Sequence, residues 1–520
     1  MSTPLALVHG DPLPDPPVPT LGEALRRAAG TGRGVTLVDG TGTRTRRSYA
    51  RLRADAARVL AGIRRAGAAP GDTVLLRPAR PADLLTAFWA CVLGGLLPVP
   101  LAPDSELDEL DEELGGAWLI GEAPPESGPA LRRLGPVAGL RAPAGDPEEH
   151  RAAPGDPALL TLTSGSSGRP KAVVLTHRNV LSRAHASALA RGLDEHTRTL
   201  NWLPLDHVSG IVMCHLRDVL LGCHQVHADT SWVRVEPLRW LDLAAAERID
   251  TTWAPDHALG LLADRLAEPA GRSWDLTGLR YVMSGGEPVR DRTARRFLAA
   301  LAPYGLPATA LHPGWGMPET SAGVVDWVYA PPGPAARRYV PVGRPHPGFS
   351  LRVVDERGAV LPERVLGRLQ VTGPSVTEHQ TDGESVQFTD DGWLVTDDLA
   401  FVDGGLLTVT GRADDLIELA GTRYHGHEIE HAVEELPFVA PASTVARSYR
   451  DGRLAVFFRL RGGTPEGEAV RLVRELLLRR YGRVPEHVEA LTGQQLARTA
   501  TGKLRKRALA DRLAELEEAG

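Results

Sequence analysis

Short apolar runs rich in β-branched residues alternate with amphipathic segments along most of the chain. Residues 49–67 have apolar side chains at helical spacing, residues 72–78 form a strand-like run, and residues 82–95 and 96–103 repeat the pair. This alternation is typical of α/β layers, in which helices cover a sheet. We therefore predict an α/β protein, and its length of 520 residues suggests roughly two to four domains.

Composition and charge argue against several classes of protein. The net charge of −6 gives no basic surface for nucleic acid, and three cysteines are too few for a disulfide framework. No apolar run approaches the ~18 residues of a membrane span, and the N-terminal stretch MSTPLALVHGDPLPDPP lacks the regions of a signal peptide. We expect a cytoplasmic enzyme whose partners include neither nucleic acid nor a membrane.

One loop between two apolar runs is built for an anion, in the stretch LLTLTSGSSGRPKAVVLTH from Leu159 to His177. Its hydroxyl-bearing and glycine residues are Thr163, Ser164, Gly165, Ser166, Ser167 and Gly168. Hydroxyls and exposed backbone N–H groups suit phosphate oxygens. The spacing to Lys171 is not that of a P-loop, and a second strand follows where a P-loop has a helix. We predict a hairpin loop that holds polyphosphate, with Lys171 neutralising charge or anchoring the loop.

Lysine is rare in this chain, which contains 59 Lys and Arg residues but lysine only at Lys171, Lys503 and Lys506. An arginine-rich chain should keep lysine mainly where a compact ammonium cannot be replaced by a planar guanidinium. Lys171 ends the anion loop, and Lys503 lies in RTATGKLRK near the C-terminus. Both are therefore candidates for phosphate chemistry.

A cluster of Cys and His residues occupies the segment MCHLRDVLLGCHQVH, residues 213–227. Zinc ligands usually occur as close pairs on turns, whereas this segment has the apolar spacing of a helix that runs into a strand. We predict core or pocket-lining residues there in preference to a zinc site. Beyond residue 412, two helix patterns and two strand patterns indicate a small C-terminal α/β unit.

Six further segments follow the anion loop in a fixed order: LPLDHVSG, MSGGEPV, GWGMPETSAG, WLVTDDLAF, GRADD and RTATGK. With the loop, they resemble the motifs of the ANL adenylating superfamily, which comprises acyl-CoA synthetases, nonribosomal peptide adenylation domains and luciferases. The resemblance covers nearly the whole chain. It implies a large N-terminal α/β domain of several subdomains, residues 1–412, that binds ATP and substrate. It also implies a small mobile C-terminal α/β lid, residues 413–520, that carries the catalytic lysine.

The resemblance also implies a role for each motif residue. The implied ATP-binding residues are Thr163, Ser164, Gly165, Ser166, Ser167, Gly168, Lys171, Gly285, Gly286, Glu287, Asp398 and Arg412. Among them, the resemblance implies that Gly285, Gly286 and Glu287 lie against the adenine and that Asp398 holds the ribose hydroxyls. The implied substrate pocket comprises His207, Val208, Ser209, Gly314, Trp315 and Gly316. The implied catalytic residues are Lys503, His207 and Glu319, with Glu319 also reaching Mg²⁺ and Asp414 acting as the hinge.

The implied chemistry joins two anions, because an oxyanion of the substrate attacks the α-phosphate of ATP and pyrophosphate leaves. Such a site must supply positive charge and positioning more than acid or base. Mg²⁺ at Glu319 and the ammonium of Lys503 are the expected sources. The leading interpretation is an acyl or aryl acid as substrate, with transfer of the acyl group to the thiol of a carrier protein or CoA.

Three positions depart from the family pattern. Pro318 replaces the usual threonine, Asp397 replaces the glycine of T-G-D, and Glu418 replaces a lysine common in thioester-forming members. The segment RYHGHEIE resembles fatty acyl-AMP ligases more than CoA ligases. We therefore expect a carrier-protein thiol to be a better acceptor than CoA. No carrier domain follows Lys503, so we expect the carrier to be a separate protein.

Two other interpretations stay open. His207, His215 and His257, with Glu418, would also suit adenylation of a small oxyanion such as nitrite by an ATP-dependent diazotase acting on an aryl amine. A non-catalytic protein of the same fold is a third interpretation, and the retained motif residues argue against it. An amino acid substrate is disfavoured, because no F-D-x-S segment is present to anchor an α-amino group.

Overall fold

A computed structural model describes residues 4–103, 105, 107, 110, 114, 116–121, 131–142, 148–164, 170–267, 271–331, 333, 337–378, 387–449, 452–493, 495–496, 509 and 512–514, without the side chains of residues 163, 164, 170 and 171. Its helices and strands form three main sheets, a smaller C-terminal sheet and two hairpins. The predicted α/β class is confirmed. In this part of the chain, no helix is both long and apolar enough to cross a bilayer.

The largest sheet has nine strands in the order β16-β15-β14-β13-β12-β10-β11-β2-β3. Six neighbouring strands from β14 to β2 run parallel, and antiparallel strands close both ends. Its strands are β2 (Gly34–Val38), β3 (Arg44–Ser48), β10 (Arg198–Asn201), β11 (His224–Ala228), β12 (Thr251–Trp253), β13 (Tyr281–Ser284), β14 (Leu311–Met317), β15 (Ala322–Asp326) and β16 (Arg344–Pro345).

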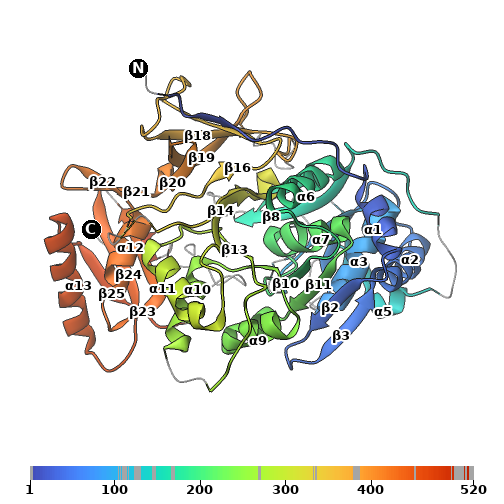
Figure 1. Cartoon of the computed structure of the whole chain (residues 1–520), viewed down its shortest axis with the longest axis horizontal. Helices are drawn as coiled ribbons and strands as arrows, with labels where there is room; N and C mark the ends of the chain where they lie inside the picture. The colour runs from blue at the N-terminus through green and yellow to red at the C-terminus, as the bar shows by residue number, and fades with distance from the viewer. Residues whose placement is uncertain are drawn as a thin grey trace.

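Helices accompany this sheet in the alternation that the sequence predicts. They are α1 (Leu21–Ala29), α2 (Tyr49–Arg65), α3 (Pro81–Gly94), α5 (Val137–Leu140), α6 (His177–Arg191), the π-helix η1 (Ser209–Leu216), α7 (Arg217–Leu221), α8 (Thr230–Val235), α9 (Leu238–Ala246), α10 (Asp256–Leu266), α11 (Asp291–Leu301) and the short 3₁₀ turns η2 (Ala302–Tyr304) and η3 (Pro318–Thr320). Figure 1 shows α1, α2 and α3 grouped beside β2 and β11, with α9 to α11 farther along the sheet.

A second sheet carries strands in the parallel order β5-β4-β6-β7. These are β4 (Thr73–Arg77), β5 (Leu97–Pro100), β6 (Trp118–Gly121) and β7 (Arg132–Gly135). The antiparallel hairpin of β8 (Pro157–Ser164) and β9 (Pro170–Thr176) shares a hydrophobic core with this sheet. The hairpin that we predicted around the anion loop is therefore present, with Thr163 opposite Lys171.

The third sheet is antiparallel and lies above β14 in Figure 1. Its strands, in spatial order, are β1 (Leu7–His9), β17 (Ser350–Val354), β18 (Gly367–Thr372), β19 (Leu394–Asp403) and β20 (Leu406–Arg412). Asp398 on β19 pairs with Arg412 on β20. This pairing places two of the predicted nucleotide residues side by side.

The C-terminal elements lie at one end of the molecule in Figure 1 and have an apolar cluster of their own, with Ile417, Ile429, Phe458 and Val473 at its centre. They are η4 (Ala413–Asp415), β21 (Leu416–Leu419), β22 (Thr422–His425), α12 (Gly426–Glu434), β23 (Val439–Tyr449), β24 (Arg453–Leu460), α13 (Glu466–Tyr481) and β25 (His487–Ala490). Ion pairs join this region to the rest, because Arg290 contacts both Asp256 and Glu434.

Gly62 offers a test of the packing between α2 and α5. Alanine normally stabilises a helix interior relative to glycine by about 1 kcal/mol, but a Cβ at Gly62 would lie 2.0 Å from the carbonyl oxygen of Leu140. We expect Gly62→Ala to destabilise the protein by about 1–3 kcal/mol through overpacking. Gly260→Ala on α10 is the control, because its Cβ would meet only Thr293 Cγ2 at 3.7 Å. Thermal unfolding compares the two; equal midpoints would contradict the account.

Candidate active site

The predicted site residues follow the carboxyl ends of the parallel strands in the nine-stranded sheet. The His207 segment follows β10, Gly285 follows β13, and Trp315 lies near the end of β14. Ligands in open α/β sheets bind at this edge, because the loops that leave parallel strands meet there. The strand directions therefore gather three motifs that lie far apart in the sequence.

Gly285 and Gly314 form a close backbone contact between β13 and β14. A Cβ on Gly285 would lie 2.6 Å from the carbonyl oxygen of Gly314, so no larger residue fits without a backbone shift. Gly286 follows with φ of +76°, a left-handed conformation that glycine adopts readily. Gly285 is therefore favoured by a close backbone contact and Gly286 by its backbone conformation.

Trp315 links β14 to the third sheet through its indole. Its Nε1–H donates a 2.8 Å hydrogen bond to Oδ2 of Asp398, and Trp315 is 9% exposed. Burial raises the pKa of the Asp398 carboxyl above its ordinary value, and the indole N–H acts in the opposite direction by stabilising the carboxylate. The predicted pocket residue and the predicted ribose residue are therefore direct neighbours, 83 residues apart in the chain.

Arg412 lies across the β19–β20 pair from Asp398 and contacts two other carboxylates. Its Nη2 donates to Asp397 Oδ2 at 2.7 Å, and its Nε donates to Asp414 Oδ1 at 3.0 Å. Asp397, which departs from the family pattern, and Asp414, the predicted hinge residue, therefore both accept hydrogen bonds from the predicted nucleotide arginine. All three side chains are about half exposed, so we expect these pairs to exchange readily with a ligand.

Glu319 lies in η3, directly after β14. Pro318 takes the first position of this turn, where its missing N–H leaves no hydrogen bond unmade. The backbone of Thr377 donates to the Glu319 carbonyl at 2.8 Å, and its hydroxyl donates to the Val174 carbonyl on β9 at 2.5 Å. Thr377 thus connects the predicted magnesium residue to the strand that leaves the anion loop.

Glu287 follows the glycines of the β13 loop and contacts the start of α10. Its Oε1 accepts from the backbone N–H of His257 at 2.8 Å and from Nδ1 of the same residue at 2.9 Å. The carboxylate therefore holds His257 in the predicted adenine region. His257 is one of the three histidines behind the small-oxyanion interpretation, and it is engaged in this pair.

His207 lies on a different element, at the start of the π-helix η1. Its Nδ1 accepts the backbone N–H of Ser209 at 3.1 Å, and its carbonyl accepts the N–H groups of Gly210 and Ile211. Nδ1 must be unprotonated to accept, so the ring is the tautomer with a proton on Nε2. The next residue, Val208, is 6% exposed and belongs to the main core.

Arg183 on α6 joins η1 to β15 from inside the core. Its Nε donates to the Gly323 carbonyl at 2.9 Å and its Nη1 to the Met213 carbonyl at 3.1 Å, while the residue is 2% exposed. Burial lowers the pKa of the guanidinium to about 10, which leaves it charged at neutral pH. Our sequence analysis missed Arg183, although its helical spacing with Val180 and Ser187 places an arginine on the buried face of α6.

Some predicted residues lie outside the described part of the chain. They are Gly165, Ser166, Ser167, Gly168 and Lys503, together with the side chains of Thr163, Ser164 and Lys171. Their roles stay predictions. Gly316 completes the end of β14, where the strand pairs with β15.

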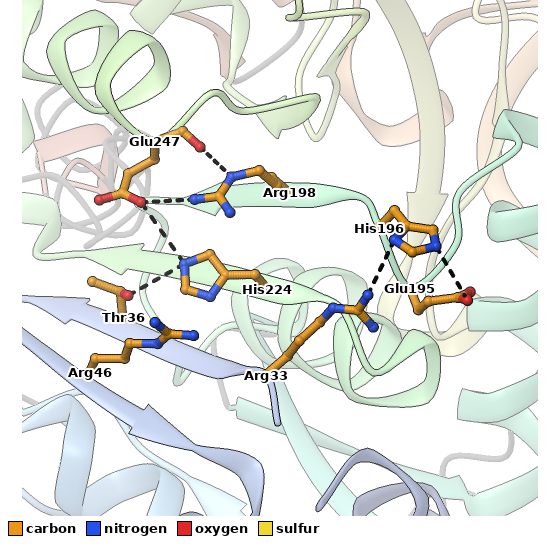
Figure 2. A pocket seen from close by; sticks show the side chains of 8 residues that line it. All are labelled: Arg33, Thr36, Arg46, Glu195, His196, Arg198, His224 and Glu247. Carbon is orange, nitrogen blue, oxygen red and sulfur yellow. Dashed lines mark hydrogen bonds and ion pairs between the residues drawn. The ribbon is translucent and has the colours of Figure 1, made fainter. Parts of the chain in front are cut away.

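A separate polar cavity of about 380 Å³ lies at the opposite edge of the nine-stranded sheet. Figure 2 shows Arg198 and His224, the first residues of β10 and β11, reaching into it from adjacent strands. The lining residues are Arg33, Thr36, Arg46, Glu195, His196, Arg198, His224 and Glu247. None of the predicted site residues that the structure describes lines this cavity.

The chain matches the family model described as "AMP-binding enzyme" over residues 25–379. It is 34% identical over 391 residues to the aspulvinone E synthetase melA of Aspergillus terreus. The matched region covers 70% of this chain and 42% of that protein. The chain thus spans less than half the length of this curated relative.

Two solved structures share the fold. The McyG A-PCP structure, complexed with phenylalanyl-adenylate, matches with a TM-score of 0.91 and 30% identity, covering 100% of this chain and 87% of that one. An adenylation domain of a keto acid-selecting NRPS module, bound to keto acyl adenylate, matches with a TM-score of 0.76 and 31% identity, covering 94% of this chain and 100% of that one. The chain belongs to the AMP-binding enzyme family, and its class is that of the adenylate-forming ligases, as the motifs indicated.

Trp315→Phe tests the contact that joins β14 to Asp398. Loss of the indole N–H should raise the pKa of Asp398, because the carboxylate loses a donor while the protonated form does not need one. The lost bond should lower the free energy of unfolding by about 1.5–3 kcal/mol at neutral pH. This deficit should shrink as the pH falls through the Asp398 pKa, where the carboxyl is protonated in both proteins.

Unfolding curves across a pH series measure this effect. Trp327→Phe is the control, because Trp327 is 42% exposed. A deficit in Trp315→Phe that did not change with pH would show that the indole contributes packing alone.

Proposed function

We propose that this chain uses ATP to adenylate a carboxylic acid. A carboxylate oxygen of the acid attacks the α-phosphorus, the bond from that phosphorus to the bridging oxygen breaks, and pyrophosphate leaves with that oxygen. The observation that carries the proposal is the hydrogen bond from Trp315 to Asp398. This bond joins the end of β14 to the carboxylate that we expect to accept the ribose hydroxyls. The same end of β14 contacts β13 through its glycine and is followed directly by the turn that carries Glu319.

The residues of the site fit ATP and magnesium. Asp398 offers acceptor oxygens for the ribose, and Arg412 offers a guanidinium within one strand pair of it. Over the described residues, no group of three or more His, Cys, Asp or Glu side chains could hold a metal by itself. Magnesium is usually held by one or two carboxylates together with substrate phosphates, which suits Glu319 as the one protein ligand. When bound, the ion would neutralise phosphate charge.

In this proposal, the chain's own residues position the reacting groups and supply positive charge. We propose that Lys503 places its ammonium between the attacking oxygen and the α-phosphate, where negative charges approach each other. Lys171 and the hydroxyls of the anion loop hold the leaving pyrophosphate. His207, with its Nε2 protonated, suits a hydrogen bond to an acid oxygen rather than proton abstraction.

We propose an acyl or aryl acid as the substrate, within secondary metabolism. The support is the synthetase relative and the two structures, one with a phenylalanyl-adenylate and one with a keto acyl adenylate. The acyl group then passes to the thiol of a carrier, whose sulfur attacks the carbonyl carbon as AMP leaves. Glu418 supports a carrier over CoA, because it is exposed on β21 and adds negative charge that would repel the phosphates of CoA.

The structure removes part of the support for the small-oxyanion alternative. His215 is 0% exposed, with both ring nitrogens hydrogen-bonded to Trp89 and Gln225, so it cannot face a substrate. His207 and Glu418 are still consistent with nitrite as the attacking oxyanion. Nitrite with an aryl amine is therefore a separate arm of the experiment.

A pyrophosphate-release screen over fatty, aryl, hydroxy, keto and amino acids tests the proposed reaction. We expect release with an acyl or aryl acid, and we expect Lys503→Ala to reduce it by ~10²-fold or more, because a charge that acts in the transition state is lost. Lys506→Ala is the matched control, three residues along the same segment, and should keep the wild-type rate. Release only with nitrite and an aryl amine would reject the carboxylic acid in favour of the alternative.

Asp414→Pro tests the proposed hinge between residues 1–412 and 413–520. Proline fixes φ near −65° and removes the backbone N–H, so the lid should be held in one orientation. We expect the variant to perform one half-reaction but not the overall transfer to a carrier thiol. Asp414→Ala, which removes the contact to Arg412 without fixing φ, should complete both steps. Equal overall turnover by wild type and Asp414→Pro would place the hinge elsewhere.

A further inference from the structure

A connected set of buried polar side chains lies next to the segment that carries His207. It draws on α2, α3, η1, β10 and β11. Its members are Tyr49, Trp89, Asn201, His215, Gln225 and His227, each no more than 3% exposed. Polar groups at this depth are costly unless each finds a partner, so the direction of every hydrogen bond can be worked out.

The first bond fixes the state of His215. The indole nitrogen of Trp89 can only donate, and it lies 2.9 Å from His215 Nε2, so Nε2 must accept. The proton of the neutral ring is therefore on Nδ1, which lies 2.8 Å from Oε1 of Gln225 and donates to it. Burial lowers the pKa of His215 to about 4, in agreement with a neutral ring.

The second branch fixes His227. Its Nε2 lies 2.5 Å from the same Gln225 oxygen and must donate, so its Nδ1 accepts from Nδ2 of Asn201 at 3.0 Å. Asn201 then closes a loop on Leu203, because its Nδ2 donates to the Leu203 carbonyl and its Oδ1 accepts the Leu203 N–H, both at 3.0 Å. Burial lowers the pKa of His227 well below its ordinary value.

A third branch leads away from the pocket segment. Nε2 of Gln225 donates to the hydroxyl of Tyr49 at 2.6 Å, and that hydroxyl donates to the carbonyl of Cys223 at 2.7 Å. This branch ties β11 to α2. It fixes which end of the Gln225 amide is oxygen, because only that orientation satisfies both histidines and the tyrosine.

The two histidine branches hold both ends of residues 203–214. Asn201 fixes the start of this segment through Leu203, and His215 fixes the end of η1. His207, Val208 and Ser209 lie between these anchors. η1 is a π-helix, a form that is rare and frequently found at functional sites, and the two anchors hold it from both sides.

We infer that Gln225 is a positioning residue for acid binding, because its single amide oxygen holds both anchors of the segment proposed to line the acid pocket. The inference rests on the proposed function in one respect, the assignment of His207, Val208 and Ser209 to that pocket. The Gln225 side chain is 1% exposed, and both ends of its amide are engaged by other members of the network. It acts by fixing His215 and His227 in one tautomeric arrangement, which holds residues 203–214 in one conformation.

Three variants separate positioning from general stability. Gln225→Leu removes both anchors and should raise the KM for the preferred acid of the screen by ~10-fold or more, because small displacements in a positioning element are costly. The KM for ATP should change less than about twofold, since the nucleotide residues lie on other elements. Gln225→Glu keeps an oxygen that accepts from both histidines and should restore most of the acid KM. Tyr49→Phe cuts only the third branch and should lower stability without changing the acid KM.

Hydrogen exchange of the ligand-free protein provides a readout that needs no substrate. Amides in residues 203–214 should exchange faster in Gln225→Leu than in wild type, and those of Tyr49→Phe should match wild type. Trp89→Phe removes one N–H at the far end of the network. It replaces Gln225→Leu in this experiment if that variant does not fold. It should loosen the same segment to a smaller extent.

The results that would overturn the inference are distinct from those that would overturn the proposed function. Unchanged exchange of residues 203–214 in Gln225→Leu, or in Trp89→Phe if it stands in, removes the positioning role whatever the substrate is. Equal increases in the KM for acid and for ATP show a global effect and also contradict it. Absence of acid-dependent pyrophosphate release by the wild type rejects the proposed function, while the exchange experiment still tests the anchors.

Discussion

A buried guanidinium holds the site-bearing elements in place. Arg183 lies on α6, the helix that follows the anion hairpin. Its side chain donates hydrogen bonds to the carbonyls of Met213 on η1 and Gly323 on β15. β15 is in turn paired with β14, which carries Trp315 and leads to Glu319. One charged group therefore joins the phosphate, acid and metal parts of the proposed site. Because its hydrogen bonds go to backbone carbonyls, Arg183 constrains the backbone path of η1 and β15 and does not depend on their side chains.

The sequence predicted the elements better than the contacts between them. The helices predicted over residues 49–67 and 82–95 and the strands predicted over 72–78 and 96–103 were correct, because their apolar spacing is a local property. The bond from Trp315 to Asp398 was not predictable from spacing, because it depends on how the antiparallel third sheet lies over the end of β14. The π-helical form of residues 209–216 was also missed, since its apolar pattern matches that of an α-helix. The sequence did contain an indication of the network around Gln225, because the polar residues Gln225 and His227 lie on the same face of a buried strand.

The structure gives physical meaning to the departures from the family pattern. Pro318 begins a short turn whose first residue needs no N–H, so the fold accommodates it without a lost bond. Asp397 pairs with Arg412, which offsets the negative charge that Asp397 adds beside Asp398. Glu418 lies opposite Arg423 in the β21–β22 hairpin, on the C-terminal region rather than among the nucleotide residues. Two of the three departures therefore lie at Arg412 or in the C-terminal region, and only Pro318 lies next to the expected metal residue.

The most direct test of the account follows oxygen from the acid to AMP. The preferred acid, labelled with ¹⁸O in its carboxylate, is incubated with ATP, magnesium and the acceptor thiol, and the products are analysed by mass spectrometry. If a carboxylate oxygen attacks the α-phosphorus and the thiol then displaces AMP, AMP should carry one ¹⁸O and pyrophosphate none. Label in pyrophosphate or phosphate, or unlabelled AMP in the presence of acyl product, would contradict adenylation of the acid by this site.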